Sequence, residues 1–153
     1  EIMSHLGVAS SFTKDGILLK KKTHETEVSV DFSDCPDLAQ TVVACAAAKG
    51  IYMKLKGIES LRIKETDRIL ALQNELKKFN AALNELEEGW FEVVPSKNIP
   101  EKIQIHTYDD HRMAMGFAPL ATHFQVSFDD KSVVNKSYPR YWDDVKSAGF
   151  TLS

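Results

Sequence analysis

The sequence predicts an α+β fold in which elements follow the order strand, helix, strand, helix, strand, strand. Three observations support this order: short segments with alternating apolar residues, an Ala-rich stretch between Pro36 and Gly50, and apolar residues three and four apart after Lys64. After residue 95 the same order starts again and stops early. We therefore expect one βαβαββ unit with a leading hairpin in about 1–95, and an incomplete second unit in about 96–153.

Turn residues and apolar spacing place the elements of the first unit. Asp15-Gly16 separates two apolar segments, and Gly tolerates the positive φ of a tight hairpin turn. Pro36 suits the first position of a helix, and the Asp37 carboxylate interacts favourably with the positive end of the helix dipole. Gly50 suits the position just after the last residue of the helix. The expected elements are a hairpin from Ala9 to Leu19, a strand from Val28 to Phe32, a helix over 36–49, a strand from Ile51 to Leu55, a loop from Gly57 to Leu61, a helix from about Lys64 to Asn80, and a hairpin of Leu83–Leu86 and Trp90–Val94.

The second unit is expected to be shorter than the first. Its predicted elements are a strand at Ile103–Ile105, a helix from about Asp110 to Ala121, strands at Gln125–Phe128 and Ser132–Val134, and a short helix starting at Pro139. The two stretches share too little sequence identity to establish a repeat from residues alone. The repeat is therefore predicted from the pattern of elements.

Composition and charge restrict the class of function. The chain is 43% hydrophobic and 27% charged, which is typical of a globular domain, and its net charge of −3 offers no basic excess to a nucleic acid. The longest apolar stretch, Leu38 to Ala48, is shorter than the roughly 20 residues that a membrane span needs. The segment from Glu1 to Val8 lacks the basic region followed by an apolar region that marks a secretory signal. Cys35 and Cys45 match neither a metal-binding pair nor a disulfide scaffold, so we expect both thiols to be reduced.

Two cations mark the start of the second predicted helix. Lys64 and Arg68 are four residues apart, so on a helix they share a face on which like charges cost about 0.2–0.5 kcal/mol. They also fall in the first turn, where the helix dipole disfavours cations. An anionic ligand bound at the helix start explains both features. A solvated face with Lys64 and Arg68 paired to Glu65 and Asp67 explains them equally well from chemistry alone.

A second charged cluster, Asp109-Asp110-His111-Arg112, falls at another strand-to-helix junction, where Arg112 can donate forked hydrogen bonds to phosphate or carboxylate. A metal site is not expected, because consecutive helical residues do not face one point and no other spaced set of His and Asp supports one. Considered alone, Asp37 is explained by its stabilising effect on the helix, and Lys136 is explained as an ordinary solvated lysine. Asp37, Lys64 and Arg112 nevertheless occupy equivalent corners that can converge on one edge of a layered fold, and Lys136 can join them.

Four stretches of the chain match the motifs of one family in order and spacing. They are Asp34–Thr41, Arg62–Arg68 with the run Lys64-Glu65-Thr66-Asp67-Arg68, Tyr108–Met115, and Lys136–Pro139. The second and third are highly specific, whereas the first and last are weak alone. Together they resemble the 5-enolpyruvylshikimate-3-phosphate synthase family, and the resemblance implies the enolpyruvyl transferase fold, an inside-out α/β barrel of repeated βαβαββ units, present here in part.

The resemblance implies transfer of the enolpyruvyl group from phosphoenolpyruvate to the 5-hydroxyl of shikimate 3-phosphate, with release of phosphate, in the shikimate pathway of aromatic amino-acid biosynthesis. It implies no metal and no cofactor. The matched motifs make Asp37 the base at the shikimate hydroxyls and Glu65 the proton donor and acceptor at the methylene carbon of phosphoenolpyruvate.

The same match assigns the binding residues. Ser60 and Lys64 are implied to contact shikimate 3-phosphate, although Ser60 stands where many members of the family have Asn. Arg68, Arg112 and Lys136 are implied to hold phosphoenolpyruvate. His111 is expected to orient its neighbours.

The family's amino-terminal Lys-Ser pair, Gly-rich loop and Ser-Ser-Gln contacts have no counterpart in the chain. We therefore expect 1–153 to be a partial carboxy-terminal domain, about the last third of a two-domain enzyme, folded but inactive alone because catalysis needs both walls of the cleft. The resemblance implies a monomer in the bacterial cytoplasm, with a plastid location left open. Two alternatives remain: a transferase acting on UDP-N-acetylglucosamine, which the two specific motifs fit less well, and a non-catalytic anion-binding module.

Overall fold

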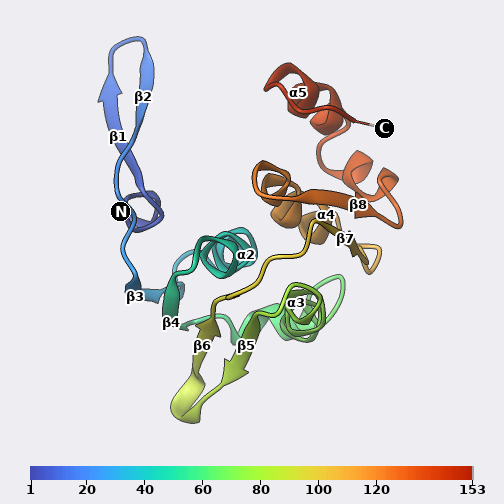
Figure 1. The fold of residues 1–153 in the computed structure, drawn as a ribbon. Helices are drawn as coiled ribbons and strands as arrows, with labels where there is room; N and C mark the ends of the chain where they lie inside the picture. Colours follow the sequence, from blue (N-terminus) through green and yellow to red (C-terminus); the bar gives the residue numbers. More distant parts are fainter. Residues whose placement is uncertain (153) are drawn as a thin grey trace.

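The computed structural model describes residues 1–152, in which a four-stranded sheet carries helices on one face and a two-stranded sheet lies further along the chain (Figure 1). The strands are β1 Val8–Thr13, β2 Gly16–Lys21, β3 Glu27–Asp31, β4 Tyr52–Lys56, β5 Ala82–Glu85, β6 Trp90–Val94, β7 Lys102–Ile105 and β8 Gln125–Phe128. The α-helices are α1 Ile2–His5, α2 Ala39–Lys49, α3 Arg68–Lys77, α4 His111–Phe117 and α5 Tyr141–Ser147. Short 3-10 turns occupy Pro36–Leu38, Glu59–Ile63, Glu87–Gly89, Ala118–Thr122 and Ser132–Lys136.

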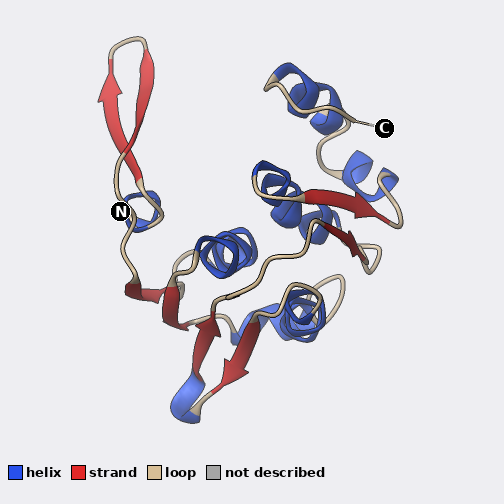
Figure 2. Cartoon of the chain, in the orientation of Figure 1, coloured by secondary structure: helices blue, strands red, loops and turns tan. Residues whose placement is uncertain are grey.

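The larger sheet has the strand order β3-β4-β6-β5, with β3 and β4 parallel and the other neighbours antiparallel. Its side chains alternate: Val30, Leu55 and Phe91 are buried, whereas Ser29 and Lys54 are exposed. The buried side is covered by α2 and α3, and α4 packs against both helices (Figure 1). The predicted order strand, helix, strand, helix, strand, strand is confirmed for this part of the chain (Figure 2).

Helix α2 begins as predicted, but in two steps. Pro36–Leu38 forms a 3-10 turn and the α-helix proper starts at Ala39. Gly50 ends it with φ 77°, in the left-handed region that glycine adopts without strain. Small alanine side chains let α2 lie close to the sheet and to α4, so the helix that follows Asp37 is firmly held.

The prediction that the second helix starts at Lys64 is wrong. Glu59–Ile63 is a 3-10 turn, Lys64 is extended with φ −97° and ψ −152°, and α3 begins only at Arg68. Asp67 fixes this start because its side chain accepts a hydrogen bond from the Leu70 N–H at 3.0 Å. Lys64 and Arg68 therefore do not share a helical face, and the like-charge argument for a ligand does not apply to them.

The second half of the chain contains fewer strands than the first. Strands β7 and β8 are parallel and α4 lies between them in the sequence, as predicted. The predicted strand Ser132–Val134 is wrong: a 3-10 turn, Ser132–Lys136, replaces it, because Val133 and Val134 are buried in a small cluster with Ala114 of α4. The last helix begins at Tyr141 rather than at Pro139.

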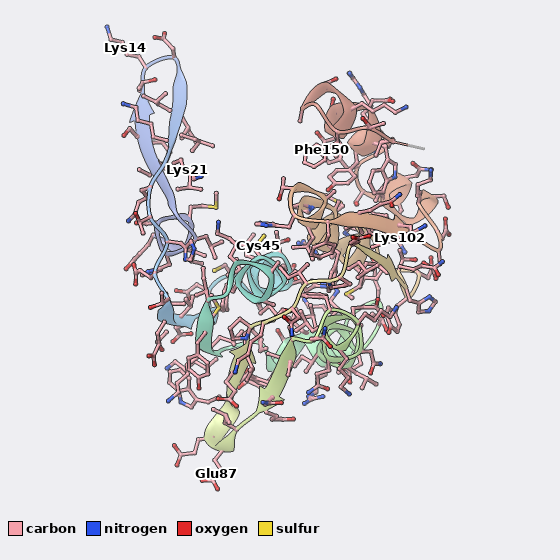
Figure 3. All side chains as sticks on the ribbon, viewed as in Figure 1. Lys14, Lys21, Cys45, Glu87, Lys102 and Phe150 are labelled. Atoms are coloured by element: carbon pink, nitrogen blue, oxygen red, sulfur yellow. The ribbon has the colours of Figure 1, made fainter. Side chains whose placement is uncertain are left out.

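The hairpin of β1 and β2 stands apart from the body of the molecule, with Lys14 at its tip (Figure 3). All of β2 is exposed, and the Phe12 side chain of β1 is 83% exposed. The short helix α1 in front of the hairpin was not predicted. Both cysteines are free thiols, as expected. Within residues 1–152, no helix has the length and apolar character needed to cross a bilayer.

Candidate functional site

Asp37 lies at the centre of the charged cluster. It sits in the 3-10 turn that leads into α2, with its side chain 39% exposed. Its Oδ1 lies 3.1 Å from Nη1 of Arg68 and 3.8 Å from Nζ of Lys64. Its Oδ2 lies 3.1 Å from Nη2 of Arg112. Three cations, two from the start of α3 and one from the start of α4, therefore converge on a carboxylate at the start of α2, and these are the three corners that the sequence predicts to meet.

Arg68 is the buried member of the cluster. Its Nε and Nη2 donate hydrogen bonds to the two carboxylate oxygens of Asp110, at 2.7 Å and 3.2 Å. Asp110 has no exposed surface and also caps α4 by accepting from the Arg112 N–H at 2.8 Å. Opposite charges at this depth stabilise each other, because a buried ion without a partner is strongly disfavoured. The pair joins the start of α3 to the start of α4.

Glu65 and Lys136 form the outer part of the cluster. Nζ of Lys136 lies 3.2 Å from Oε2 of Glu65 and donates to the carbonyl oxygen of Asp109 at 2.7 Å. Nδ1 of His111 lies 3.3 Å from the same oxygen of Glu65. Desolvation lowers the pKa of Lys136, but the hydrogen bond and charge of Glu65 outweigh it, so the pKa of Lys136 is raised above its usual value. Lys136 is therefore a cation at neutral pH.

Ser60 and Lys64 belong to the segment between β4 and α3. Ser60 is exposed on the 3-10 turn Glu59–Ile63, and Lys64 follows that turn. This turn contacts the 3-10 turn that holds Asp37. The structure thus brings six of the seven predicted site residues into two groups of ion pairs, one around Asp37 and one between Glu65 and Lys136. The seventh, Ser60, lies on the turn that contacts the Asp37 turn.

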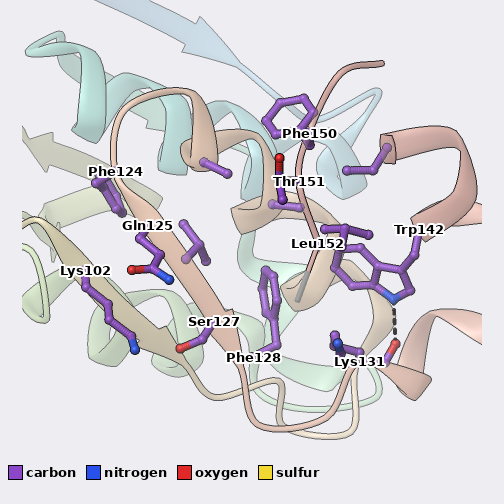
Figure 4. Close-up of a pocket in the computed structure, with 14 residues that line it drawn as sticks. Lys102, Phe124, Gln125, Ser127, Phe128, Lys131, Trp142, Phe150, Thr151 and Leu152 are labelled. Atoms are coloured by element: carbon purple, nitrogen blue, oxygen red, sulfur yellow. Dashed lines mark hydrogen bonds between the residues drawn. The ribbon is translucent and has the colours of Figure 1, made fainter. Parts of the chain in front are cut away.

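A hollow of about 240 Å³ opens beside Asp37 and Arg112. Its lining is Asp37, Gln40, Thr41, His111, Arg112, Met115, Ser137 and Tyr138. A larger cavity, of about 560 Å³, lies on β8 near Lys102 and Phe150, and Phe124, Phe128 and Trp142 give it a mainly apolar wall (Figure 4). None of the predicted site residues lines this larger cavity, so the hollow at the charged cluster is the candidate site.

Glu65, Asp110 and His111 bring one possible metal ligand each to within 4.8 Å of one another. The sequence predicts Asp110 as the first helical residue, whereas in the structure Asp110 caps α4 from outside the helix. Both oxygens of Asp110 accept hydrogen bonds from Arg68, and Glu65 contacts Lys136. Cations of the protein already neutralise two of the three groups, which weakens the set as a metal site.

Two buried carboxylates received no role of their own from the sequence. Asp110 and Arg68 are 42 residues apart in the sequence, and no spacing rule predicts a contact at that separation. Glu75 is 1% exposed and lies on the same buried face of α3 as Leu72 and Leu76. A single acidic residue on an apolar helical stripe is the signal that could have identified Glu75.

Comparison with known proteins gives a consistent result. A family model described as EPSP synthase (3-phosphoshikimate 1-carboxyvinyltransferase) matches residues 1–145. A relative of that name from Bacteroides fragilis is 46% identical over 158 residues, covering 99% of this chain and 38% of its own length. Relatives of the same name from Clostridium acetobutylicum and Methanopyrus kandleri are 36% and 34% identical; these matches cover 84% and 97% of this chain, and 30% and 35% of the relatives.

A solved EPSP synthase structure from Acinetobacter baumannii matches the fold with a TM-score of 0.70 at 21% identity, covering 99% of this chain and 38% of that one. Together with the family match, this likeness gives the chain the enolpyruvyl transferase fold. More narrowly, the chain belongs to the EPSP synthase (3-phosphoshikimate 1-carboxyvinyltransferase) family, because the family model matches nearly all of it. The chain spans 38% of the length of the Bacteroides fragilis relative.

Proposed function

We propose that the chain is the carboxy-terminal part of a 3-phosphoshikimate 1-carboxyvinyltransferase and forms one wall of its active site. The supporting observation is the convergence of Lys64, Arg68 and Arg112 on the Asp37 carboxylate. Two substrates that carry phosphate and carboxylate groups require several cations around them, and the starts of α3 and α4 supply these three. The reaction joins shikimate 3-phosphate to phosphoenolpyruvate and releases phosphate.

In this proposal Asp37 accepts the proton of the shikimate 5-hydroxyl while the hydroxyl oxygen attacks the enol carbon of phosphoenolpyruvate. Glu65 donates a proton to the methylene carbon, and it takes a proton back from the resulting methyl group as phosphate leaves the tetrahedral intermediate. The two carboxylates have different neighbours, the two arginines for Asp37, and Lys136 and His111 for Glu65. This separation supports one carboxylate for each proton transfer.

The binding roles follow the same division. Lys64 and Ser60 face shikimate 3-phosphate, and Arg112 and Lys136 hold phosphoenolpyruvate. Arg68 lies behind them, with Nη1 on Asp37 and its other donors on Asp110. For Arg68 to hold phosphoenolpyruvate directly, its Nη1 must exchange Asp37 for the ligand. His111 orients Glu65.

The chain alone is proposed to be inactive. Asp37, Lys64 and Glu65 are each more than a third exposed, and the hollow beside Asp37 is open to solvent. Closure by an amino-terminal domain removes water and aligns the reacting atoms. We further propose that the whole protein is a cytoplasmic monomer that uses no metal or organic cofactor.

The proposal is tested with an assembled enzyme, made by combining the chain with the amino-terminal portion of the Bacteroides fragilis relative that the chain does not cover. Co-elution of the two parts verifies assembly, and phosphate release is then measured with shikimate 3-phosphate and phosphoenolpyruvate. We expect release only when both parts and both substrates are present. Asp37→Asn and Arg112→Ala should abolish it, whereas Arg140→Ala, which removes an 80% exposed arginine, should not. A folded, assembled pair without phosphate release contradicts the proposal and favours an anion-binding module.

A further inference from the structure

A tight turn between β7 and α4 places two consecutive residues in the left-handed region. Tyr108 has φ 55° and Asp109 has φ 53°, and the Asp110 N–H donates to the Thr107 carbonyl at 2.9 Å. Positive φ at both central residues is the pattern of a type I′ turn, which favours Gly, Asn and Asp. A tyrosine at the first of these positions is strained and persists only where other contacts hold it.

This turn sets the contacts of three site cations. The carbonyl oxygen of Asp109 accepts from Nζ of Lys136 at 2.7 Å. The next residue, Asp110, holds Arg68 through both carboxylate oxygens. Arg112 lies in the first turn of the helix that Asp110 caps. A rotation of the turn therefore displaces the partners of Arg68 and Lys136 together.

Glu75 holds the turn from the neighbouring helix. Its Oε1 accepts the Tyr108 hydroxyl at 2.9 Å, and its Oε2 accepts the His106 N–H at 3.0 Å. Nζ of Lys78 lies 2.6 Å from the same Oε2. Glu75 is 1% exposed and stands seven residues, about two helical turns, after Arg68 on α3. A buried carboxylate with three donors is well suited to hold α3 and the turn in one arrangement.

The remaining contacts of the turn support the same arrangement. The Thr107 N–H and hydroxyl both donate to Oδ1 of Asp129, at 2.9 Å and 2.8 Å. Burial, followed by the hydrogen bond to Glu75, raises the pKa of Tyr108 above its usual value. The Tyr108 hydroxyl therefore keeps its proton at neutral pH and remains a hydrogen-bond donor to Glu75.

We propose that Glu75 and Tyr108 are positioning residues for the phosphoenolpyruvate side of the site, an inference that rests on the proposed function. Neither residue touches substrate. Their hydrogen bond fixes the left-handed turn, and the turn fixes the Asp109 carbonyl toward Lys136 and Asp110 toward Arg68. Loss of this bond should weaken the hold on phosphoenolpyruvate while the shikimate side, built from the segment around Lys64, is spared.

The test is Tyr108→Phe, which removes only the hydroxyl, in the assembled enzyme. We expect KM for phosphoenolpyruvate to rise about tenfold, the factor that corresponds to ~1.4 kcal/mol, while KM for shikimate 3-phosphate changes less than about twofold. Tyr52→Phe is the matched control, since Tyr52 also donates its hydroxyl to a glutamate, Glu92 of the four-stranded sheet. Glu75→Gln combined with Tyr108→Phe should raise KM no further than the worse single variant, because both act through one contact.

An unchanged KM for phosphoenolpyruvate in Tyr108→Phe, with the unsubstituted enzyme active, overturns the inference and leaves the proposed function intact. Equal increases in both KM values also overturn it, because they indicate general loosening. An inactive unsubstituted enzyme contradicts the proposed function instead. In that case amide hydrogen exchange on the 153-residue chain tests whether Glu75 and Tyr108 hold the turn. We expect Tyr108→Phe to speed exchange of the Arg112 N–H about tenfold, and an unchanged exchange rate overturns the inference.

Discussion

The guanidinium of Arg68 and the carboxylate of Asp110 form an ion pair almost entirely removed from solvent, with side chains 4% and 0% exposed. The two residues are the first residue of α3 and the residue that caps α4. One electrostatic contact therefore joins the two helices whose starts carry most of the candidate site. The stability of the fold and the geometry of the site depend on the same pair.

Asp110→Ala should destabilise the chain by roughly 3–5 kcal/mol, because it takes the main partner away from the buried Arg68 charge and removes the cap of α4. Urea unfolding measures the change. The control is Glu85→Ala, which removes an exposed partner of Arg62 and should cost less than about 1 kcal/mol. Equal losses in the two variants contradict the importance assigned to the buried pair.

Gly57→Ala should be more damaging than Gly50→Ala, although both glycines have φ 77°. An added Cβ at Gly57 lies 2.4 Å from the backbone N of Ser33, whereas nothing lies within 4 Å of one at Gly50. The left-handed backbone costs an alanine about 1–2 kcal/mol at either position. The clash with Ser33 should add about 1–3 kcal/mol at Gly57.

The difference between the two glycine variants in chemical denaturation isolates the close approach of Gly57 to Ser33. Because Gly57 precedes the Ser60 segment and Ser33 precedes Asp37, the Gly57→Ala variant should also lose more activity in the assembled enzyme. If the two variants are equally stable, Gly57 and Ser33 do not approach each other closely enough for an added Cβ to clash.

Asp31 should titrate at an unusually low pH. The side-chain hydrogen bond from Ser33 and then its backbone N–H, with a contribution from Lys56, lower the pKa of Asp31 from 3.8 to about 2. A carboxylate with a lowered folded-state pKa stabilises the fold above its unfolded pKa, and that contribution is lost as the pH falls through about 2. An NMR titration should give a midpoint near 2 for Asp31, and Ser33→Ala should move it upward. A midpoint near 3.8 in the unsubstituted chain contradicts this.

The hairpin of β1 and β2 should be energetically separate from the core. Phe12 is 83% exposed and Phe79 is fully buried. Thermal or urea unfolding should therefore show a change within about 0.5 kcal/mol for Phe12→Ala and a loss of about 3–5 kcal/mol for Phe79→Ala. A large loss in Phe12→Ala shows instead that the hairpin packs against the rest of the chain.

Local signals in the sequence were sufficient for most of the elements. The turn at Asp15-Gly16, the helix bounded by Pro36 and Gly50, and the alternating strands were predicted because each depends on neighbouring residues. Ser132–Val134 has the composition of a strand, but burial of Val133 and Val134 against α4 decided its structure. That burial depends on contacts distant in sequence, which local patterns do not reveal.

The site was predicted at the level of residues but not of contacts. Equivalent corners indicated that Asp37, Lys64 and Arg112 meet, and they do. The start of α3 was misplaced, because the capping side chain of Asp67 outweighs the apolar spacing that suggested a start at Lys64. The buried partner of Arg68 could not be predicted, since either acidic neighbour on the far segment, Asp109 or Asp110, satisfies the sequence pattern equally.

We propose that the charged cluster around Asp37 is one wall of a two-substrate site. A crystal structure of the assembled enzyme with shikimate 3-phosphate and phosphoenolpyruvate tests this proposal. We expect Arg112 and Lys136 within hydrogen-bond distance of phosphoenolpyruvate, Lys64 on shikimate 3-phosphate, and the Asp37 carboxylate at the reacting 5-hydroxyl. Substrates bound away from these residues, with the ion pairs of Asp37 unchanged, would contradict it.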